Sequence, residues 1–264
     1  MLSRKIRFGC AVGALLCAIL AGAGFELAQA AQQTASITVS AAISLKDALD
    51  EIGGTYEQSH PGAKVTFNYG GSGTLQHQIE QGAPVGIFFP AAEKQMDALE
   101  SEGLILAGTR RDVATNVLVL IAPASSVLVK NFQDLARPEI KVVALGEPAT
   151  VPAGMYAQQT LDHMRLLMAV KNKTVYAKDV RQVLTYVETG NADAGIVYQT
   201  DARISSQVRV AATAPADSHD PIVYPVAILK GAKNIPSARA FLDYLAGPEA
   251  RAIFVKYGFG VPEK

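Results

Sequence analysis

Hydroxyl groups stand at two expected helix starts in this 264-residue chain. Ser44 precedes a stretch of helical periodicity, and Ser72 lies in the glycine loop 70–73 before another such stretch. The first turn of a helix presents backbone N–H groups without intrahelical partners, together with a partial positive charge. It can therefore hold an anion without a basic side chain, and glycines let the backbone come close to a ligand. The chemistry indicated is anion binding by neutral donors.

Two further helix starts have no functional side chain. Ala153 stands beside a proline that suits the first turn of a helix, and Val180 follows Asp179, a predicted N-cap. Residue type alone would not select either of them as a ligand contact. Ordinary capping also explains both serines, because a serine at a helix start most often satisfies the helix itself. Tyr198 ends an apolar strand, where a packed hydroxyl is the commoner role.

Strands and helices alternate along the chain, which is typical of an α/β protein with mostly parallel sheets. Two sets of roughly four such units fit two lobes better than one sheet. The apolar strands at 116–122 and 223–229 are the best candidates for crossings between lobes. We therefore predict that residues 31–115 plus 223–264 form lobe I and that residues 116–222 form lobe II.

The N-terminus has the three parts of a secretory signal in the required order. Lysine and arginine within residues 1–7 precede an uncharged, mostly apolar run at 8–20, and residues 28–30 (AQA) offer a small-x-small cleavage pattern. We expect residues 1–30 to be a cleaved signal peptide, with Ala31 as the new N-terminus. The apolar run is short for a membrane span, and no later stretch reaches the roughly 18 to 20 apolar residues needed. An uncleaved anchor is the alternative.

Both cysteines, Cys10 and Cys17, fall inside this segment. A lipid attachment site needs small residues before its cysteine, whereas two leucines precede Cys17, so a lipoprotein is not favoured. The mature chain would contain no cysteine. That excludes disulfides, thiolate metal sites and a cysteine nucleophile together.

Composition and motifs argue against nucleic-acid binding and against catalysis. The segment holds three of the 24 basic and one of the 24 acidic residues, so the mature chain has a net charge near −2. Nucleic-acid and anionic-membrane binding rely on basic patches. The sequence contains no dinucleotide-binding motif and no P-loop. Residues 70–74 lack the second glycine of the nucleophile elbow, so a serine hydrolase that uses Ser72 is only a distant alternative. The histidines are scattered without metal-ligand spacing: His60, His77, His163 and His219.

Five strings cover nearly all of the mature chain and occur together in one known family. They are SAAISLKDAL, GGSGTLQHQIEQGAP, VPAGMYAQQTL, KDVRQVLTYVETGNADAGIVYQTDA and FLDYLAGPEARAIFVKYGF. In order and spacing they resemble the periplasmic molybdate-binding proteins of ABC importers. The resemblance implies a class II periplasmic-binding-protein fold, in which two α/β lobes joined by a hinge close on molybdate or tungstate.

The resemblance also implies a site, a compartment and partners. In that family hydroxyls and backbone N–H groups hold the oxyanion, and the matching positions are Ser44, Ser72, Ala153, Val180 and Tyr198. Molybdenum would enter only within the oxyanion, without protein–metal ligands, cofactor or catalysis. The implied partners are the permease and ATPase subunits of an ABC importer. We expect a monomer in the periplasm, because an untethered carrier would be lost from a cell with a single membrane.

A site that offers only donors suits a fully deprotonated dianion such as molybdate, tungstate or sulfate. Hydrogen phosphate carries a proton and would need an acceptor. Cavity size must separate molybdate from the smaller sulfate, since each buried donor left unpaired costs about 1–3 kcal/mol. A carrier of sulfate or another tetrahedral oxyanion on the same fold is the alternative. A ferric carrier is less favoured because the tyrosines are isolated in the sequence.

One stretch departs from the family pattern. Family members read close to GAPADVFISADEKWMD, whereas this chain has GAPVGIFFPAAEKQMD. The departures are Gly86, Pro90, Ala92 and Gln95, none of which is among the five predicted contacts. We interpret this segment as a place where lobe packing, closure, partner contact or ligand preference differs.

Overall fold

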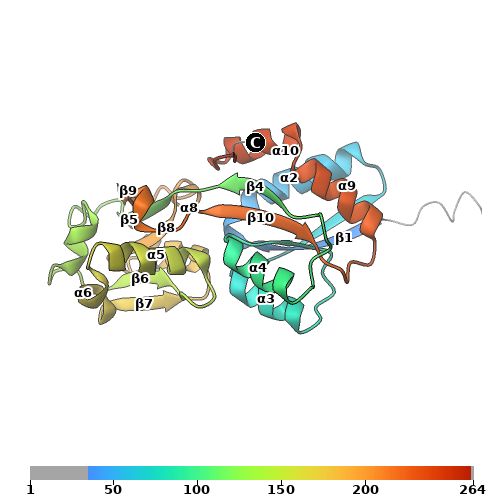
Figure 1. The fold of residues 1–264 in the computed structure, drawn as a ribbon. Coiled ribbons are helices and arrows are strands. Elements are labelled where there is room, and N and C mark those ends of the chain that lie inside the picture. The colour runs from blue at the N-terminus through green and yellow to red at the C-terminus, as the bar shows by residue number, and fades with distance from the viewer. Residues whose placement is uncertain (1–34, 263–264) are drawn as a thin grey trace, which may run out of the picture. The chain divides into compact units, whose positions relative to one another are not determined.

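The computed structural model of the chain describes residues 35–262, and two five-stranded sheets form the framework of this part (Figure 1). The first sheet has the strand order β2-β1-β3-β10-β4 and the second has the order β7-β6-β8-β5-β9. The strands of the first sheet are β1 (Ala35–Ala42), β2 (Ala63–Gly70), β3 (Ile87–Phe89), β4 (Arg111–Thr115) and β10 (Val223–Ile228). Those of the second are β5 (Leu118–Pro123), β6 (Val143–Gly146), β7 (Thr174–Ala177), β8 (Ala194–Tyr198) and β9 (Val208–Thr213).

The predicted signal peptide lies outside the described residues. Within residues 35–262, no helix combines the length and the apolar character that a membrane span requires.

The chain passes from the first sheet to the second between β4 and β5, and returns between β9 and β10. The first passage consists of Asn116 and Val117, and the second of residues 214–222. The two passages touch, because the Asn116 N–H donates to the Ile222 carbonyl over 3.3 Å. We call the part built on the first sheet lobe I and the part built on the second lobe II. The predicted lobe boundaries fall within these passages and remain a prediction.

Both sheets are mixed. β1 pairs in parallel with β3, and β6 pairs in parallel with β7 and β8. β10 and β5 are antiparallel to both of their neighbours, so each sheet combines parallel and antiparallel pairs. Each of these two strands enters its sheet directly from a passage, without the helical crossover that parallel pairing requires.

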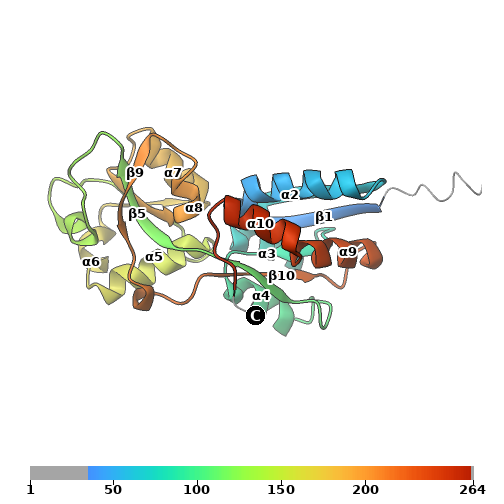
Figure 2. The same cartoon turned by 90° about the horizontal axis from the view of Figure 1, so that it is seen from above.

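Helices cover both faces of each sheet (Figures 1 and 2). In lobe I, α2, α9 and α10 pack together on one face, and α3 and α4 pack on the other. In lobe II, α5 and α7 pack against β6 and β8 from opposite faces. The α-helices are α2 (Lys46–Ser59), α3 (Ser72–Glu80), α4 (Glu93–Ser101), α5 (Pro152–His163), α6 (Leu167–Lys171), α7 (Val180–Glu188), α8 (Gln199–Ala202), α9 (Ile235–Leu245) and α10 (Pro248–Lys256). Short 3-10 turns are η1 (Ile43–Leu45), η2 (Phe132–Ala136) and η3 (Ala216–Ser218).

Helix α7 shows how local sequence determines where a helix starts and which face it buries. The Asp179 carboxylate accepts the Gln182 N–H over 2.9 Å, which confirms the predicted N-cap. Its apolar positions Val183, Leu184 and Val187 are all buried. The Gln182 side chain accepts from the Lys178 N–H over 2.8 Å, a second side-chain contact at the start of this helix.

Tertiary packing accounts for the places where local sequence signals mislead. Helix α2 continues through Gly53 and Gly54 because its apolar face, to which Leu49, Ile52 and Gly53 belong, is buried in the core. Burial outweighs the roughly 1 kcal/mol that each glycine costs a helix. The edge strand β7 was not predicted: two of its four residues are exposed, so it shows neither an alternating pattern nor a continuous buried run.

Gly154 is the point where α5 lies closest to β6. A Cβ atom there would overlap the carbonyl oxygen of Gly146 and lie 2.5 Å from its carbonyl carbon, whereas a Cβ atom at the exposed Gly54 meets nothing within 4 Å. We predict that Gly154→Ala lowers the free energy of unfolding by about 1–3 kcal/mol through overpacking. The matched variant Gly54→Ala raises it by about 1 kcal/mol through helix propensity. Urea unfolding measures both, and a Gly154→Ala protein as stable as the unsubstituted chain would contradict this packing.

Candidate functional site

The carboxyl ends of parallel strands from both lobes meet around one small pocket, which is where open α/β sheets bind ligands. β1 ends at Ala42, β2 at Gly70 and β8 at Tyr198, while α5 and α7 begin shortly after β6 and β7. The pocket has a volume of about 200 Å³, its open mouth included. The residues that line it are Ala42, Ile43, Ser44, Gly70, Gly71, Ser72, Ala91, Val151, Pro152, Ala153, Val180 and Tyr198.

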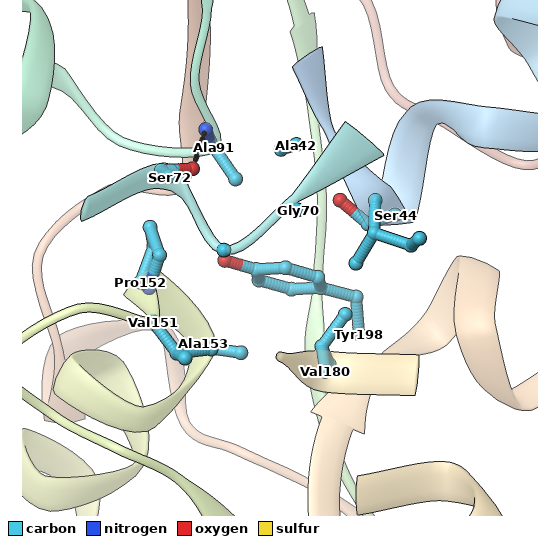
Figure 3. A pocket seen from close by; sticks show the side chains of 12 residues that line it. Ala42, Ser44, Gly70, Ser72, Ala91, Val151, Pro152, Ala153, Val180 and Tyr198 are labelled. Carbon is cyan, nitrogen blue, oxygen red and sulfur yellow. Dashed lines mark hydrogen bonds between the residues drawn. The ribbon is translucent and has the colours of Figure 1, made fainter. Parts of the chain in front are cut away.

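All five residues predicted as ligand contacts lie in the wall of this pocket (Figure 3). Ser44 and Ser72 come from lobe I, and Ala153, Val180 and Tyr198 come from lobe II. None of the five is more than 3% exposed. In Figure 3 the ring of Tyr198 lies between the two serines and the pair formed by Ala153 and Val180. The fold thus brings together residues that are up to 154 positions apart, and their contact with a ligand remains a prediction.

Three of the five stand in the first turn of an α-helix. Ser72 is the first residue of α3, Ala153 the second of α5 and Val180 the first of α7. Ser44 precedes α2 by two residues and lies inside the 3-10 turn η1, which runs directly into that helix. The N–H groups at these positions belong to the first turn and have no intrahelical acceptor. They are free to bind an acceptor in the pocket.

No residue that lines the pocket has a charged side chain, within the part of the chain that the structure describes. Arg181 follows Val180 but is engaged by two carboxylates: Nε donates to Asp201 over 2.6 Å, and Nη2 donates to Asp47 over 2.6 Å. Burial raises the pKa of Asp201 to about 6, against the opposing effect of the guanidinium. Arg181 therefore joins α2 of lobe I to α7 and α8 of lobe II and does not enter the pocket.

The Tyr198 hydroxyl is a buried polar atom that has no hydrogen-bond partner among residues 35–262. Burial raises the pKa of Tyr198 well above its ordinary value, so the hydroxyl keeps its proton at neutral pH and can donate it. A buried hydroxyl left unpaired costs about 1–3 kcal/mol. An acceptor bound in the pocket would remove this penalty.

A backbone N–H group orients the Ser72 hydroxyl. The backbone N–H of Ala91 donates to Ser72 Oγ over 3.0 Å (dashed line in Figure 3). Because an N–H group can only donate, the oxygen of Ser72 is the acceptor of this bond. The hydrogen of the Ser72 hydroxyl is left for a partner in the pocket.

Ala91 is a pocket residue that sequence reasoning missed. It belongs to the segment 86–95, which departs from the family pattern and of which no residue was among the five predicted contacts. The segment reaches the pocket both through the Ala91 N–H and through the Ala91 side chain. Its position two residues after β3, a parallel neighbour of β1, is the signal that could have revealed it.

The glycine loop brings the two lobes into contact. The Gly73 N–H donates to the Thr150 carbonyl of lobe II over 2.8 Å. A Cβ atom at Gly73 would lie 2.6 Å from Thr150 Cα, and one at Gly71 would lie 2.8 Å from the carbonyl oxygen of Lys178. We interpreted these glycines as allowing close approach of a ligand. In the structure they allow close approach of the opposite lobe.

Metal binding by side chains finds no support in the described residues, where no three or more His, Cys, Asp or Glu side chains are grouped so that they could hold an ion.

The sequence and fold match known proteins over most of the chain. A family described as bacterial extracellular solute-binding protein matches residues 37–260. The chain is 42% identical over 247 residues to the molybdate-binding protein ModA of Haemophilus influenzae, covering 91% of this chain and 94% of that protein. It is 38% identical over 252 residues to ModA of Escherichia coli, covering 92% and 97%. The solved structure of the periplasmic molybdate-binding protein of Azotobacter vinelandii matches with a TM-score of 0.77 and 29% identity, covering 86% of this chain and all of that one.

Proposed function

Because this chain belongs to the family of bacterial extracellular solute-binding proteins, we propose that it captures molybdate, and also tungstate, and delivers the anion to an ABC importer. One observation carries the proposal: five donor positions from two lobes surround a single pocket whose described lining has no charged side chain. The identity to two ModA proteins supports molybdate as the ligand. Molybdate is cargo in this account, and no cofactor takes part.

The proposed contacts are three hydroxyls and two backbone groups. Ser44, Ser72 and Tyr198 donate their O–H groups, and Ala153 and Val180 donate backbone N–H groups at the starts of α5 and α7. Hydrogen bonds to a charged acceptor are roughly twice as strong as neutral ones, so five donors can replace much of the hydration of a dianion. No acceptor is offered to the proton of hydrogen phosphate.

Binding without catalysis fits the surroundings of Ser72. A serine nucleophile needs a general base within hydrogen-bond reach. Ser72 Oγ accepts a hydrogen bond from the Ala91 N–H, and the described lining contains no histidine, aspartate or glutamate. We therefore do not propose a hydrolase.

Closure of the lobes is part of the proposed cycle. Two contacts join the lobes beside the pocket: the Gly73–Thr150 hydrogen bond and the Asp47–Arg181 ion pair. We propose that both form when the lobes close on the anion, exclude water and complete the surface that the permease and ATPase partners read. The periplasm is the proposed compartment and a monomer the proposed state.

Thermal unfolding with different anions tests the proposed ligand. We predict that the chain without residues 1–30 is stabilised by about 4 kcal/mol when molybdate or tungstate is present at about 1,000 times its dissociation constant. Hydrogen phosphate at the same concentration should give no shift, because its proton finds no acceptor. Ser72→Ala should bind molybdate at least tenfold more weakly and remain folded, with a lower ligand-free unfolding temperature because the Ala91 N–H loses its acceptor.

Two results would contradict this prediction in different ways. No shift with either molybdate or tungstate removes the proposed function. A larger shift with sulfate than with molybdate, at equal low concentrations, assigns the pocket to the alternative ligand of the same fold.

Substitution of Gly73 tests the role of closure. We predict that Gly73→Ala weakens molybdate binding at least tenfold, because the new methyl group meets Thr150 backbone atoms of the opposite lobe. The ligand-free unfolding temperature should hardly change, since an open arrangement avoids the clash. Calorimetric titration measures the affinity, with Gly54→Ala as a control that lies away from the pocket. Wild-type affinity in Gly73→Ala would show that the lobes need not approach each other here.

A further inference from the structure

Two linked hydrogen bonds, one buried and one partly buried, lead from Ser44 away from the pocket to the passages between the lobes. Ser44 Oγ lies 3.2 Å from the hydroxyl of Tyr224, and the Tyr224 hydroxyl lies 3.1 Å from Nδ2 of Asn116. Tyr224 is completely buried near the start of β10, just after the second passage. Asn116 is part of the first passage, and its N–H binds Ile222 in the second. These hydrogen bonds therefore connect Ser44, a proposed ligand residue, with both passages.

The orientation of the Asn116 amide is determined by its neighbours. The Val117 N–H donates to Asn116 Oδ1 over 2.9 Å, so the amide oxygen faces this backbone group. The nitrogen Nδ2 faces Tyr224 and also Thr200, whose Oγ1 is 2.9 Å away. An amide NH₂ group has two hydrogens to donate and does not accept. The Tyr224 oxygen is therefore the acceptor of the bond from Asn116.

The bond from Asn116 uses one lone pair of the Tyr224 oxygen and leaves the Tyr224 hydrogen available to Ser44. Burial raises the pKa of Tyr224, so its hydroxyl keeps its single hydrogen at neutral pH. With its oxygen accepting from Asn116, Tyr224 can donate that hydrogen to Ser44 Oγ. Ser44 is then the acceptor on this side, and its own hydrogen is left for the pocket. If Tyr224 did not donate to Ser44, the Ser44 hydroxyl could turn its hydrogen toward Tyr224 and leave only lone pairs facing the anion.

We propose that Asn116 and Tyr224 are positioning residues that set the Ser44 hydroxyl as a donor toward the bound oxyanion, and so couple the passages between the lobes to ligand binding. This inference rests on the proposed function. It gives Ser44 the arrangement that the Ala91 N–H gives Ser72: in both cases a donor behind the serine occupies its oxygen and leaves its hydrogen for the ligand.

A double-mutant cycle between Tyr224 and Ser44 tests the proposal. The affinity is measured by calorimetric titration with whichever of molybdate, tungstate and sulfate binds the wild type most tightly. We predict that Tyr224→Phe weakens binding about tenfold when Ser44 is present, because a donor to a charged acceptor loses its orientation. In the Ser44→Ala background the same substitution should weaken binding less than about twofold, since no hydroxyl remains to be oriented. A merely structural role of Tyr224 would weaken binding equally in both backgrounds.

A second variant reverses the direction of the hydrogen bonds between residue 116, Tyr224 and Ser44 instead of removing one of them. An aspartate at position 116 has no hydrogen to donate and would accept from Tyr224, whose oxygen would then accept from Ser44. We predict that Asn116→Asp weakens binding about a hundredfold when Tyr224 is present. The loss should be at least fivefold smaller in the Tyr224→Phe background, where only the added negative charge acts. The ligand-free unfolding temperature of each variant shows whether it is folded.

The outcomes separate this inference from the proposed function. If none of the three anions binds the wild type, the proposed function is overturned and the inference with it. If the wild type binds and the losses are independent of background in both cycles, only the inference is overturned. If Tyr224→Phe does not fold, the affinity loss caused by Asn116→Asp is compared between the wild-type and Ser44→Ala backgrounds. An equal loss in the two backgrounds would overturn the inference.

Discussion

An anion with two charges can leave water only if hydrogen-bond donors take the place of its hydration shell. This pocket has no charged side chain in its described lining, so the dianion binding that we propose requires its hydroxyls and N–H groups to point their hydrogens inward. The N–H groups of α5 and α7 do so by helix geometry. The hydroxyls can turn, and each one needs something to hold it. For Ser72 that is the Ala91 N–H, and for Ser44 we propose Tyr224.

The architecture follows from this requirement. Parallel strands such as β1 with β3 and β6 with β8 place their carboxyl ends, and the helix starts that follow, at one edge of each sheet. Two such edges facing each other surround a ligand with backbone donors from both sides. The antiparallel strands β5 and β10 serve a different purpose, because they carry the chain between the lobes. Asn116 and Tyr224 belong to this connecting region.

Sequence reasoning predicted the elements that have strong local signals and missed those that depend on tertiary packing. The cap at Asp179 predicted the start of α7 correctly. Strands β4 and β7 and helix α6 were missed. These elements are only four or five residues long, too short for a clear period.

The site was harder to predict than the fold, because several of its groups belong to the backbone. Ala153 and Val180 were identified as ligand contacts only through the family resemblance, because every residue except proline has a backbone N–H and residue type therefore does not mark such a contact. Ala91 acts through its N–H as well and was missed. The pair of Asn116 and Tyr224 lies 108 positions apart, so no local pattern could connect them. The glycines at 71 and 73 were noticed, but the atoms that approach them are those of the opposite lobe.

The central claim is that neutral donors alone hold a dianion in this pocket. A crystal structure of the chain without residues 1–30, grown with tungstate, tests it most directly, because the anomalous signal of tungsten locates the anion. The account predicts a tungsten peak in the pocket, with tungstate oxygens within hydrogen-bond distance of the Ser44, Ser72 and Tyr198 hydroxyls and of the Ala153 and Val180 N–H groups. A tungsten peak outside the pocket, or tungstate oxygens bound by a lysine or arginine side chain, would contradict it.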